Sequence, residues 1–354
     1  MKRFSIILPV LLTALLFYAC TGGENLLDET TTEPSEPETT SAPEIFPEQE
    51  REYMDYTKFY SGAFKGQTSP ALAESGGEII VADVTLDTEN IALFSNGYEG
   101  SDCSAAIQNA IYTVYNAGGG TVYLHAGVYT VGSPILIKPF VTLAGSWPDT
   151  VIAAVVAPSD NELPALFTVG GSGGVRDLTV YYPEQDIDDA KSYPFTFYIP
   201  GVGEGADYAN YMLPCIFDVT VINGYRGIVA SKYDNWVNEQ ITISDFRGTF
   251  LHTGLELYNS ADASVIRDVE FSPSVWSDFR GELYGFAPSP SKDRIATYTI
   301  EHTSAYIIGD LEWSQWQNLS ADSCLYGLHT VKGFRTRFSG IYSIMFRLQI
   351  APTV

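Results

Sequence analysis

Two carboxylates in the C-terminal part of the sequence are spaced to act as a general acid and a general base. Asp310 and Glu312 are separated by one residue, Leu311. On a β-strand, such residues face the same side, with Cα atoms about 6.6 Å apart. Glycoside hydrolysis needs two carboxyl groups, about 6.5–9.5 Å apart in inverting enzymes. Asp310 and Glu312 are therefore the predicted catalytic pair, with Leu311 and Trp313 pointing into the core. The alternative is a solvated outer face.

Aromatic side chains could support a sugar ring next to this pair. Trp276 lies in the longest apparent insertion, from Ser272 to Thr303, and Trp316 follows the carboxylate pair closely. Long loops of a repetitive fold tend to fall on its binding face. Trp276 and Trp316 are therefore the predicted substrate-binding residues, and packing in the core is the alternative.

Metal-binding patterns are weak in this sequence. The four histidines are scattered, and Cys103, Cys215 and Cys324 have neither zinc spacing nor an even number for a disulfide framework. The acidic loop 186–189 offers oxygen ligands to Ca²⁺ but lacks the glycine turn and closing glutamate of an EF-hand. We predict no cofactor, with Ca²⁺ at this loop as the alternative.

The elements that would position these residues are short. Asp102 is a suitable N-cap for a helix whose apolar face is formed by Ile107, Ala110, Ile111 and Val114. Strands of three to five residues follow at 121–124, 128–131, 135–137 and 141–143. Because glycine or proline separates most of these strands, the pattern predicts tight corners between them.

A degenerate repeat occupies the rest of the chain. The segment 175–180 returns at 216–221, with weaker copies at 239–243, 266–271 and 317–320. Its polar position is expected at 177, 218, 240, 268 and 318. A strand of this kind cannot bury its inner face alone, but stacked rungs of roughly 22–28 residues bury a continuous core. The repeat therefore predicts an all-β solenoid.

The opening segments resemble the N-terminal part of the pectate-lyase superfamily. The resemblance is carried by 102–108, by Gly118-Gly119-Gly120-Thr121-Val122-Tyr123-Leu124, by 126–129 and by 141–145. It implies a right-handed parallel β-helix, the pectin lyase fold, with an N-terminal capping helix. The later segment 308–318 is similar to the branch that contains β-1,3-glucanases. The resemblance covers about residues 78–345.

Function is less constrained than fold, because this fold carries many chemistries. The Gly-His-Gly of polygalacturonases and the Arg-x-Pro-x-x-Arg of pectate lyases are absent from the sequence. We predict an extracellular polysaccharide-active protein, of glycoside hydrolase type. The alternatives are a non-catalytic carbohydrate-binding or surface-shaft protein and a pectate-lyase-type lyase. The apolar end of the sequence also suggests that a further segment follows Val354.

The N-terminus is typical of an export signal. Lys2 and Arg3 precede an apolar run that ends at Cys20, which resembles a bacterial lipoprotein signal over residues 1–20. Residues 21–52 are rich in Thr, Pro and Glu and should form a disordered linker. Residues 53–354 would then be the β-helix domain. We predict a lipid anchor at Cys20 and a location outside the cell, at its surface.

Charge excludes some partners. The chain has 43 acidic against 19 basic side chains, a formal net charge of −24. Residues 24–52 contain ten of the acids and one arginine, so most of the negative charge belongs to the body. A body this acidic is repelled by phosphate backbones and anionic lipid. We therefore expect no nucleic-acid partner and membrane contact only through the lipid anchor.

Overall fold

The computed structural model describes residues 84–86, 102–201, 212–232, 237–331 and 343–349. All of these described residues belong to one compact unit. The predicted signal, lipid site at Cys20 and linker lie outside the described residues. None of the helices within the described ranges is both long enough and apolar enough to cross a membrane.

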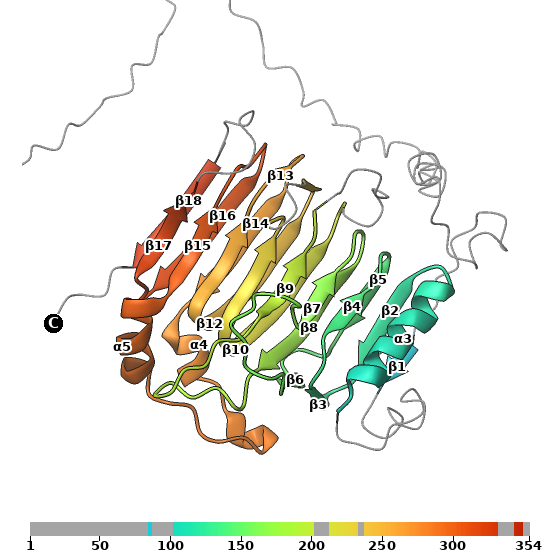
Figure 1. The fold of residues 1–354 in the computed structure, drawn as a ribbon, viewed down its shortest axis with the longest axis horizontal. Helices are drawn as coiled ribbons and strands as arrows, with labels where there is room; N and C mark the ends of the chain where they lie inside the picture. Colours follow the sequence, from blue (N-terminus) through green and yellow to red (C-terminus); the bar gives the residue numbers. More distant parts are fainter. Residues whose placement is uncertain (1–83, 87–101, 202–211, 233–236, 332–342, 350–354) are drawn as a thin grey trace, which may run out of the picture. The chain divides into compact units, whose positions relative to one another are not determined.

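The described residues form a right-handed parallel β-helix, as predicted, whose rungs pass along three faces (Figure 1). Every strand pair in the described residues is parallel. Parallel strands need crossover connections, and such connections are right-handed in nearly all proteins. In this coil, the remaining strands and turns of a rung connect its face 1 strand to the face 1 strand of the next rung.

Face 1 contains one strand from each rung, in sequence order. Its strands are β1 (Val84–Leu86), β2 (Gly120–Leu124), β5 (Val141–Ala144), the first parts of β8 (Gly174–Tyr181), β10 (Cys215–Ala230) and β12 (Thr242–Leu257), then β14 (Val265–Phe271), β16 (Gln315–Asp322) and β18 (Ser343–Gln349).

Faces 2 and 3 complete each rung. Face 2 begins with β3 (Gly127–Val131) and β6 (Thr150–Ala154) and continues through the later residues of β8, β10, β12 and β14. Face 3 contains β4 (Ile135–Ile137), β7 (Phe167–Val169), β9 (Phe195–Ile199), the ends of β10 and β12, β15 (Ser304–Ile308) and β17 (Tyr326–Thr330). At the corner between faces 3 and 1, β11 (Asn238–Glu239) pairs with β13 (Ser260–Ala261).

The core lies inside the coil and is built from stacked side chains. One inward position of face 1 holds Leu178, Val219, Phe246, Val269 and Leu319 in successive rungs, all fully or almost fully buried. Aromatic rings continue the stack between rungs, with Phe246 near Phe197 and Phe271 at ring-centroid distances of 6.2 and 6.1 Å. The predicted division of each strand into inner apolar and outer polar positions is therefore realised.

Helix α3 (Ser104–Asn116) forms where the apolar periodicity predicted it. Its apolar face joins the same core as β1 and β2. Cys103, rather than Asp102, occupies the N-cap position, but the Asp102 carboxylate still accepts the Ser104 N–H at 2.9 Å and the Gly132 N–H at 3.1 Å. The capping role of this helix stays a prediction.

One long insertion interrupts the stack between β14 and β15. It contains α4 (Pro273–Ser277), a 3-10 turn η3 (Gly281–Tyr284) and α5 (Lys292–His302) (Figure 1). Ser272 and Ser291 begin α4 and α5 by accepting backbone N–H groups of Ser274 and Arg294. The insertion predicted from the sequence at 272–303 is thus largely helical.

Two tryptophans close together in sequence test which side chains at the start of β16 face the core and which face solvent. Trp316 is fully buried next to Tyr306, whereas Trp313 is 56% exposed. Trp316→Ala should lower the free energy of unfolding by about 3–5 kcal/mol because it leaves a cavity in a packed core. Trp313→Ala should change it by no more than about 0.5 kcal/mol. Urea unfolding followed by circular dichroism measures both, and equal effects of the two substitutions would contradict the register of β16.

Candidate functional site

A ladder of acidic side chains runs along the corner between faces 1 and 2. Strand register stacks Asp177, Asp218, Asp245 and Asp268 in four successive rungs, and Asn318 continues the ladder. All five have φ between 48° and 57°, the left-handed conformation that Asp and Asn tolerate best among non-glycine residues. We call these five residues the aspartate ladder.

The predicted repeat was wrong at one rung of this ladder. The sequence pattern placed the polar residue at Gln240, but the register of β10 and β12 places Asp245 there. Gln240 belongs to the other corner, between faces 3 and 1, where it also has a positive φ of 56°. Both corners use a polar residue before an apolar strand, so the short motif does not distinguish them.

The members of the aspartate ladder differ in their partners. Asp177 is paired with Arg176, Asp245 accepts the Ser244 hydroxyl, and Asp268 accepts the Asn318 side-chain N–H at 2.7 Å. Within the described residues, Asp218 has no hydrogen bond or ion pair. Partial burial, and then the negative charges of Asp245 and Asp177, raise the pKa of Asp218 above its ordinary value, and Arg247 opposes this rise.

A second outward row lies two residues further along each strand, on face 2. Register aligns Thr179, Thr220, Arg247 and Glu270 in the same four rungs as the aspartates. We call these four residues the floor row, because they form the floor of a groove of about 430 Å³. The floor therefore presents two hydroxyls, one guanidinium and one carboxylate next to the aspartate ladder.

Trp147 forms one wall of this groove. Its indole is 46% exposed, its Nε1–H donates to the Thr220 hydroxyl at 3.3 Å, and the Arg247 guanidinium lies 5.5 Å from the ring centroid. The turn that carries Trp147 rests on the ladder, since the Gly145 N–H donates to the Arg176 carbonyl at 3.0 Å. A Cβ at Gly145 would lie 2.5 Å from the Asp177 carbonyl oxygen, so only glycine permits this approach.

The insertion forms the opposite wall. Ser274, Val275, Asp278, Phe279, Arg280, Leu283 and Tyr284 line the groove from that side. Behind them, Trp276 and Ile295 pack against outward apolar residues of face 2, among them Tyr181 and Leu251. The insertion is therefore held on face 2 by a second apolar cluster outside the coil.

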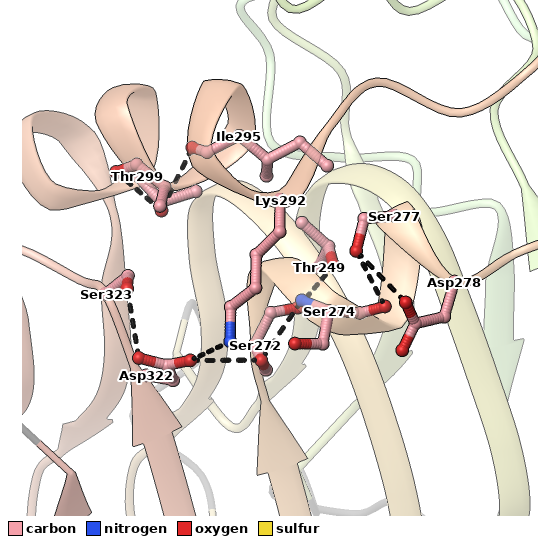
Figure 2. A network of polar contacts seen from close by, with 11 residues as sticks. Thr249, Ser272, Ser274, Ser277, Asp278, Lys292, Ile295, Thr299, Asp322 and Ser323 are labelled. Carbon is pink, nitrogen blue, oxygen red and sulfur yellow. Dashed lines mark hydrogen bonds and ion pairs between the residues drawn. The ribbon is translucent and has the colours of Figure 1, made fainter. Parts of the chain in front are cut away.

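Polar contacts fasten the insertion to the rungs (Figure 2). The Trp276 N–H donates to the Thr249 hydroxyl at 3.0 Å. The Lys292 ammonium lies 3.1 Å from the Asp322 carboxylate, which also accepts the Ser323 hydroxyl at 2.9 Å. These contacts join α4 and α5 to β12 and to the end of β16. The wall of the groove is thus attached at both of its helices.

The acidic loop 186–189 is occupied by cationic side chains. Arg294 of α5 pairs with Asp188, and Lys191 pairs with Asp189 at 2.6 Å. Among the described residues, no group of three or more metal-ligating side chains is arranged to hold a metal ion. The Ca²⁺ alternative for this loop therefore has no support in the described residues. The Arg294–Asp188 ion pair instead connects the loop to α5 of the insertion.

The predicted substrate-binding tryptophans are structural. Trp316 is 0% exposed in the core and Trp276 is 3% exposed beneath the insertion, so neither ring is available for stacking on a sugar. This burial disfavours the predicted binding role, because Trp316 fills the solenoid core and Trp276 fills the apolar cluster outside it. Trp147, which the sequence analysis did not select, is the exposed tryptophan of the groove.

The predicted catalytic pair does not line the groove. Asp310 and Glu312 lie in the turn after β15, not on a strand, where the Asp310 carbonyl and the Glu312 N–H are hydrogen-bonded to the backbone of Ser260. Leu311 is buried as expected, but Trp313 points outward, because its φ of 51° breaks the strand alternation. A catalytic role for this pair stays a prediction.

Comparisons with known proteins find similarity to enzymes that act on polysaccharides. No family model matches the chain. Mannuronan C5-epimerase AlgE4 of Azotobacter vinelandii is 36% identical over 119 residues, which cover 30% of this chain and 21% of that protein. Alginate lyase 7 of the same organism is 31% identical over 120 residues, 30% of this chain and 14% of that protein. The chain spans about a fifth or less of the length of these relatives.

Solved structures give weaker similarities. An iota-carrageenase in complex with iota-carrageenan fragments is 16% identical, with a TM-score of 0.38, and the match covers 74% of this chain and 60% of that one. The A-module of AlgE4 from Azotobacter vinelandii is 18% identical, with a TM-score of 0.32, covering 68% and 75%. At these scores, the fold assignment depends on the strand pairing of this chain itself.

The stacking of charges at the aspartate ladder can be measured directly. Asp245→Asn removes a negative charge next to Asp218, so ionising Asp218 becomes easier and its pKa should fall. Titration of the Asp218 carboxyl carbon by NMR measures this change. Asp262→Asn is the matched control, because Asp262 also has a positive φ but lies at the other corner. An unchanged Asp218 pKa in Asp245→Asn would contradict the proposed stacking.

Proposed function

We propose that this chain acts on an extracellular polysaccharide and that the aspartate ladder and the adjacent groove form its active site. The general class is supported by the relatives, whose names describe enzymes of mannuronan and alginate. The predicted export signal supports a location where such polymers occur. Because the chain covers only a small part of each relative, their names indicate candidate reactions and do not establish one for this chain.

The observation that carries the proposal is the asymmetry of the aspartate ladder. Asp218 lies between two carboxylates, has no partner of its own among the described residues and has a raised pKa. Asp245, beside it, accepts the Ser244 hydroxyl. General acid catalysis by a carboxyl requires a raised pKa next to a second carboxyl group, and the direction of the Asp218 pKa shift agrees with this requirement.

This arrangement favours glycoside hydrolysis, the reaction type predicted from the sequence. Neighbouring parallel strands are about 4.8 Å apart, so carboxyls in adjacent rungs have a separation close to the 5–5.5 Å of retaining glycosidases. Asp218 would protonate the glycosidic oxygen as the bond to the anomeric carbon breaks. Asp245 would attack that carbon, and water, deprotonated by Asp218, would then release the sugar. The active pair is thus shifted from Asp310 and Glu312 to the ladder.

The groove supplies the means to hold a sugar chain. The exposed face of Trp147 can pack against the apolar face of a pyranose ring, while Thr179, Thr220 and Glu270 offer hydrogen bonds to hydroxyl groups. The floor row spans four rungs, which is about 14 Å at the strand spacing. Such a surface suits several linked sugars better than one free sugar.

A second candidate is proton abstraction from a uronate sugar, which begins both lyase and epimerase reactions. Arg247 favours it, because a guanidinium binds a sugar carboxylate in bidentate geometry and disperses the charge that develops next to it. An ionised ladder carboxylate would accept the proton. The names of the two relatives favour this alternative, whereas the acidic surroundings of Arg247 disfavour an anionic polymer.

The products identify the reaction. Laminarin, pectin and alginate are incubated with the protein and with its Asp218→Asn and Asp245→Asn variants. We expect new reducing ends without ultraviolet absorption, and a loss of kcat by about 100-fold or more in each variant, as removal of acid–base help causes. Unsaturated products or a changed uronate composition by NMR would favour the second candidate.

Variants of the other pair serve as the comparison. Asp310→Asn and Glu312→Gln are tested beside the ladder variants, since the two pairs make opposite predictions. Loss of activity in these variants, with activity retained in Asp218→Asn and Asp245→Asn, would return the site to Asp310 and Glu312. A wild-type protein that binds a polysaccharide but forms no product would indicate a carbohydrate-binding module.

A further inference from the structure

Trp313 is an exposed aromatic side chain without a structural role in the described residues. It is 56% exposed, more than any other tryptophan described, and no ring contact or side-chain hydrogen bond is made by its indole among the described residues. Its φ of 51° is uncommon for a bulky residue and costs conformational energy. Burial of the ring would recover this cost, but the ring points to solvent.

The backbone holds this ring on a rigid base. The Glu312 N–H donates to the Ser260 carbonyl at 2.7 Å, and the Gln315 N–H donates to the Ser264 carbonyl at 2.7 Å. Ser314 is fully buried on the other side of the chain. Hydrogen bonds to the preceding rung therefore fix the chain on both sides of Trp313 and hold its indole outward.

Strand stacking places an acidic residue in the rung next to Trp313. Leu213, Gln240, Asp262 and Trp313 occupy the same corner position in successive rungs, with φ between 51° and 59°. Asp262 precedes Trp313 by one rung, and Glu312 is its neighbour in the chain. A flat apolar ring with acidic residues nearby can match the apolar face and the hydroxyl groups of a pyranose ring.

An exposed polar strand connects this corner with the aspartate ladder. Gln315 and Gln317 are exposed on the outer side of β16, whereas Ser314 and Trp316 point inward. The next residue, Asn318, is the last member of the aspartate ladder. Asn318 follows Trp313 by five positions, a distance of about 16 Å along an extended chain. A polysaccharide, unlike a single sugar, can reach from one to the other.

We propose that Trp313 is the platform of a second sugar-binding surface, which takes pyranose units of a polysaccharide and extends across the outer side of β16 towards the aspartate ladder. The proposal builds on the function inferred above, but it concerns binding and not bond cleavage. Gln315 and Gln317 supply hydrogen bonds along the path, and Trp147 holds the polymer on the far side of the ladder. The surface favours long chains over short ones.

Affinity gel electrophoresis measures this binding without any need for catalysis. The wild-type protein and Trp313→Ala are run in gels that contain laminarin, pectin or alginate, and dissociation constants are obtained from the retardation. We expect Trp313→Ala to weaken binding of at least one of these polymers by roughly fivefold or more, the usual effect of truncating an aromatic binding hot spot. Circular dichroism checks that the variant is folded.

Two further variants show whether binding depends on the aromatic ring or on the corner position. Trp313→Phe keeps an aromatic face and should retain most of the binding. Leu213→Ala changes an exposed apolar side chain of the same corner position, 40% exposed and with a φ of 59°, and should bind like wild type. Equal weakening by Leu213→Ala would mean that the corner, not the indole, is responsible, and would overturn the proposal.

Other outcomes also separate this proposal from the proposed enzyme. Trp313-dependent retardation without any product from wild type supports the binding surface and rejects the enzyme. Unchanged binding in Trp313→Ala, with normal product formation by wild type, rejects the surface and keeps the enzyme. If none of the three polymers retards the wild-type protein, the binding surface is rejected as well.

Discussion

The register of parallel stacking is the constraint on which the rest of this molecule depends. Each rung is hydrogen-bonded to the next with little shift over most of its length, so a residue type repeated along the chain becomes a row in space. Inward positions become stacks of Leu, Val and Phe, and their burial stabilises the coil. Outward positions become rows of whatever chemistry the sequence repeats, at a spacing of about 4.8 Å.

That spacing explains why the candidate site is electrostatically unusual. Four aspartates at one corner repel each other, and the left-handed backbone at each of them adds a conformational cost. Neighbouring side chains form an ion pair or a hydrogen bond with three of the four aspartates. Asp218 has no such partner among the described residues, and its pKa is raised. The insertion and the Trp147 turn then border the row of groups, so that a repetitive surface becomes a groove with two different walls.

Much of the fold was predictable, because hydrophobic periodicity is a local signal. The helix at 104–116, the first four strands and three of the four later copies of the repeat lie where the pattern placed them. The copy at 239–243 was placed at the wrong corner, because both Gln240 and Asp245 precede an apolar strand and only register with Asp218 distinguishes them.

The site was less predictable. Trp276 and Trp316 are of a residue type common in sugar sites but fill apolar clusters. Trp147 and Arg247 are 100 residues apart in sequence and meet only through the stacking of rungs. The one available signal for Trp147 was its place in a Gly-Ser-Trp-Pro turn next to a predicted strand.

A crystal structure of the Asp218→Asn variant with a bound oligosaccharide of the preferred polymer would show whether the aspartate ladder holds the bond that is cleaved, because the substitution removes the proposed acid while it preserves the size of the side chain. We expect a sugar ring on the face of Trp147, with a glycosidic oxygen within hydrogen-bonding distance of residue 218 and an anomeric carbon next to Asp245. A sugar chain bound away from the aspartate ladder, or one whose glycosidic oxygen lies beside Asp310 or Glu312, would contradict it.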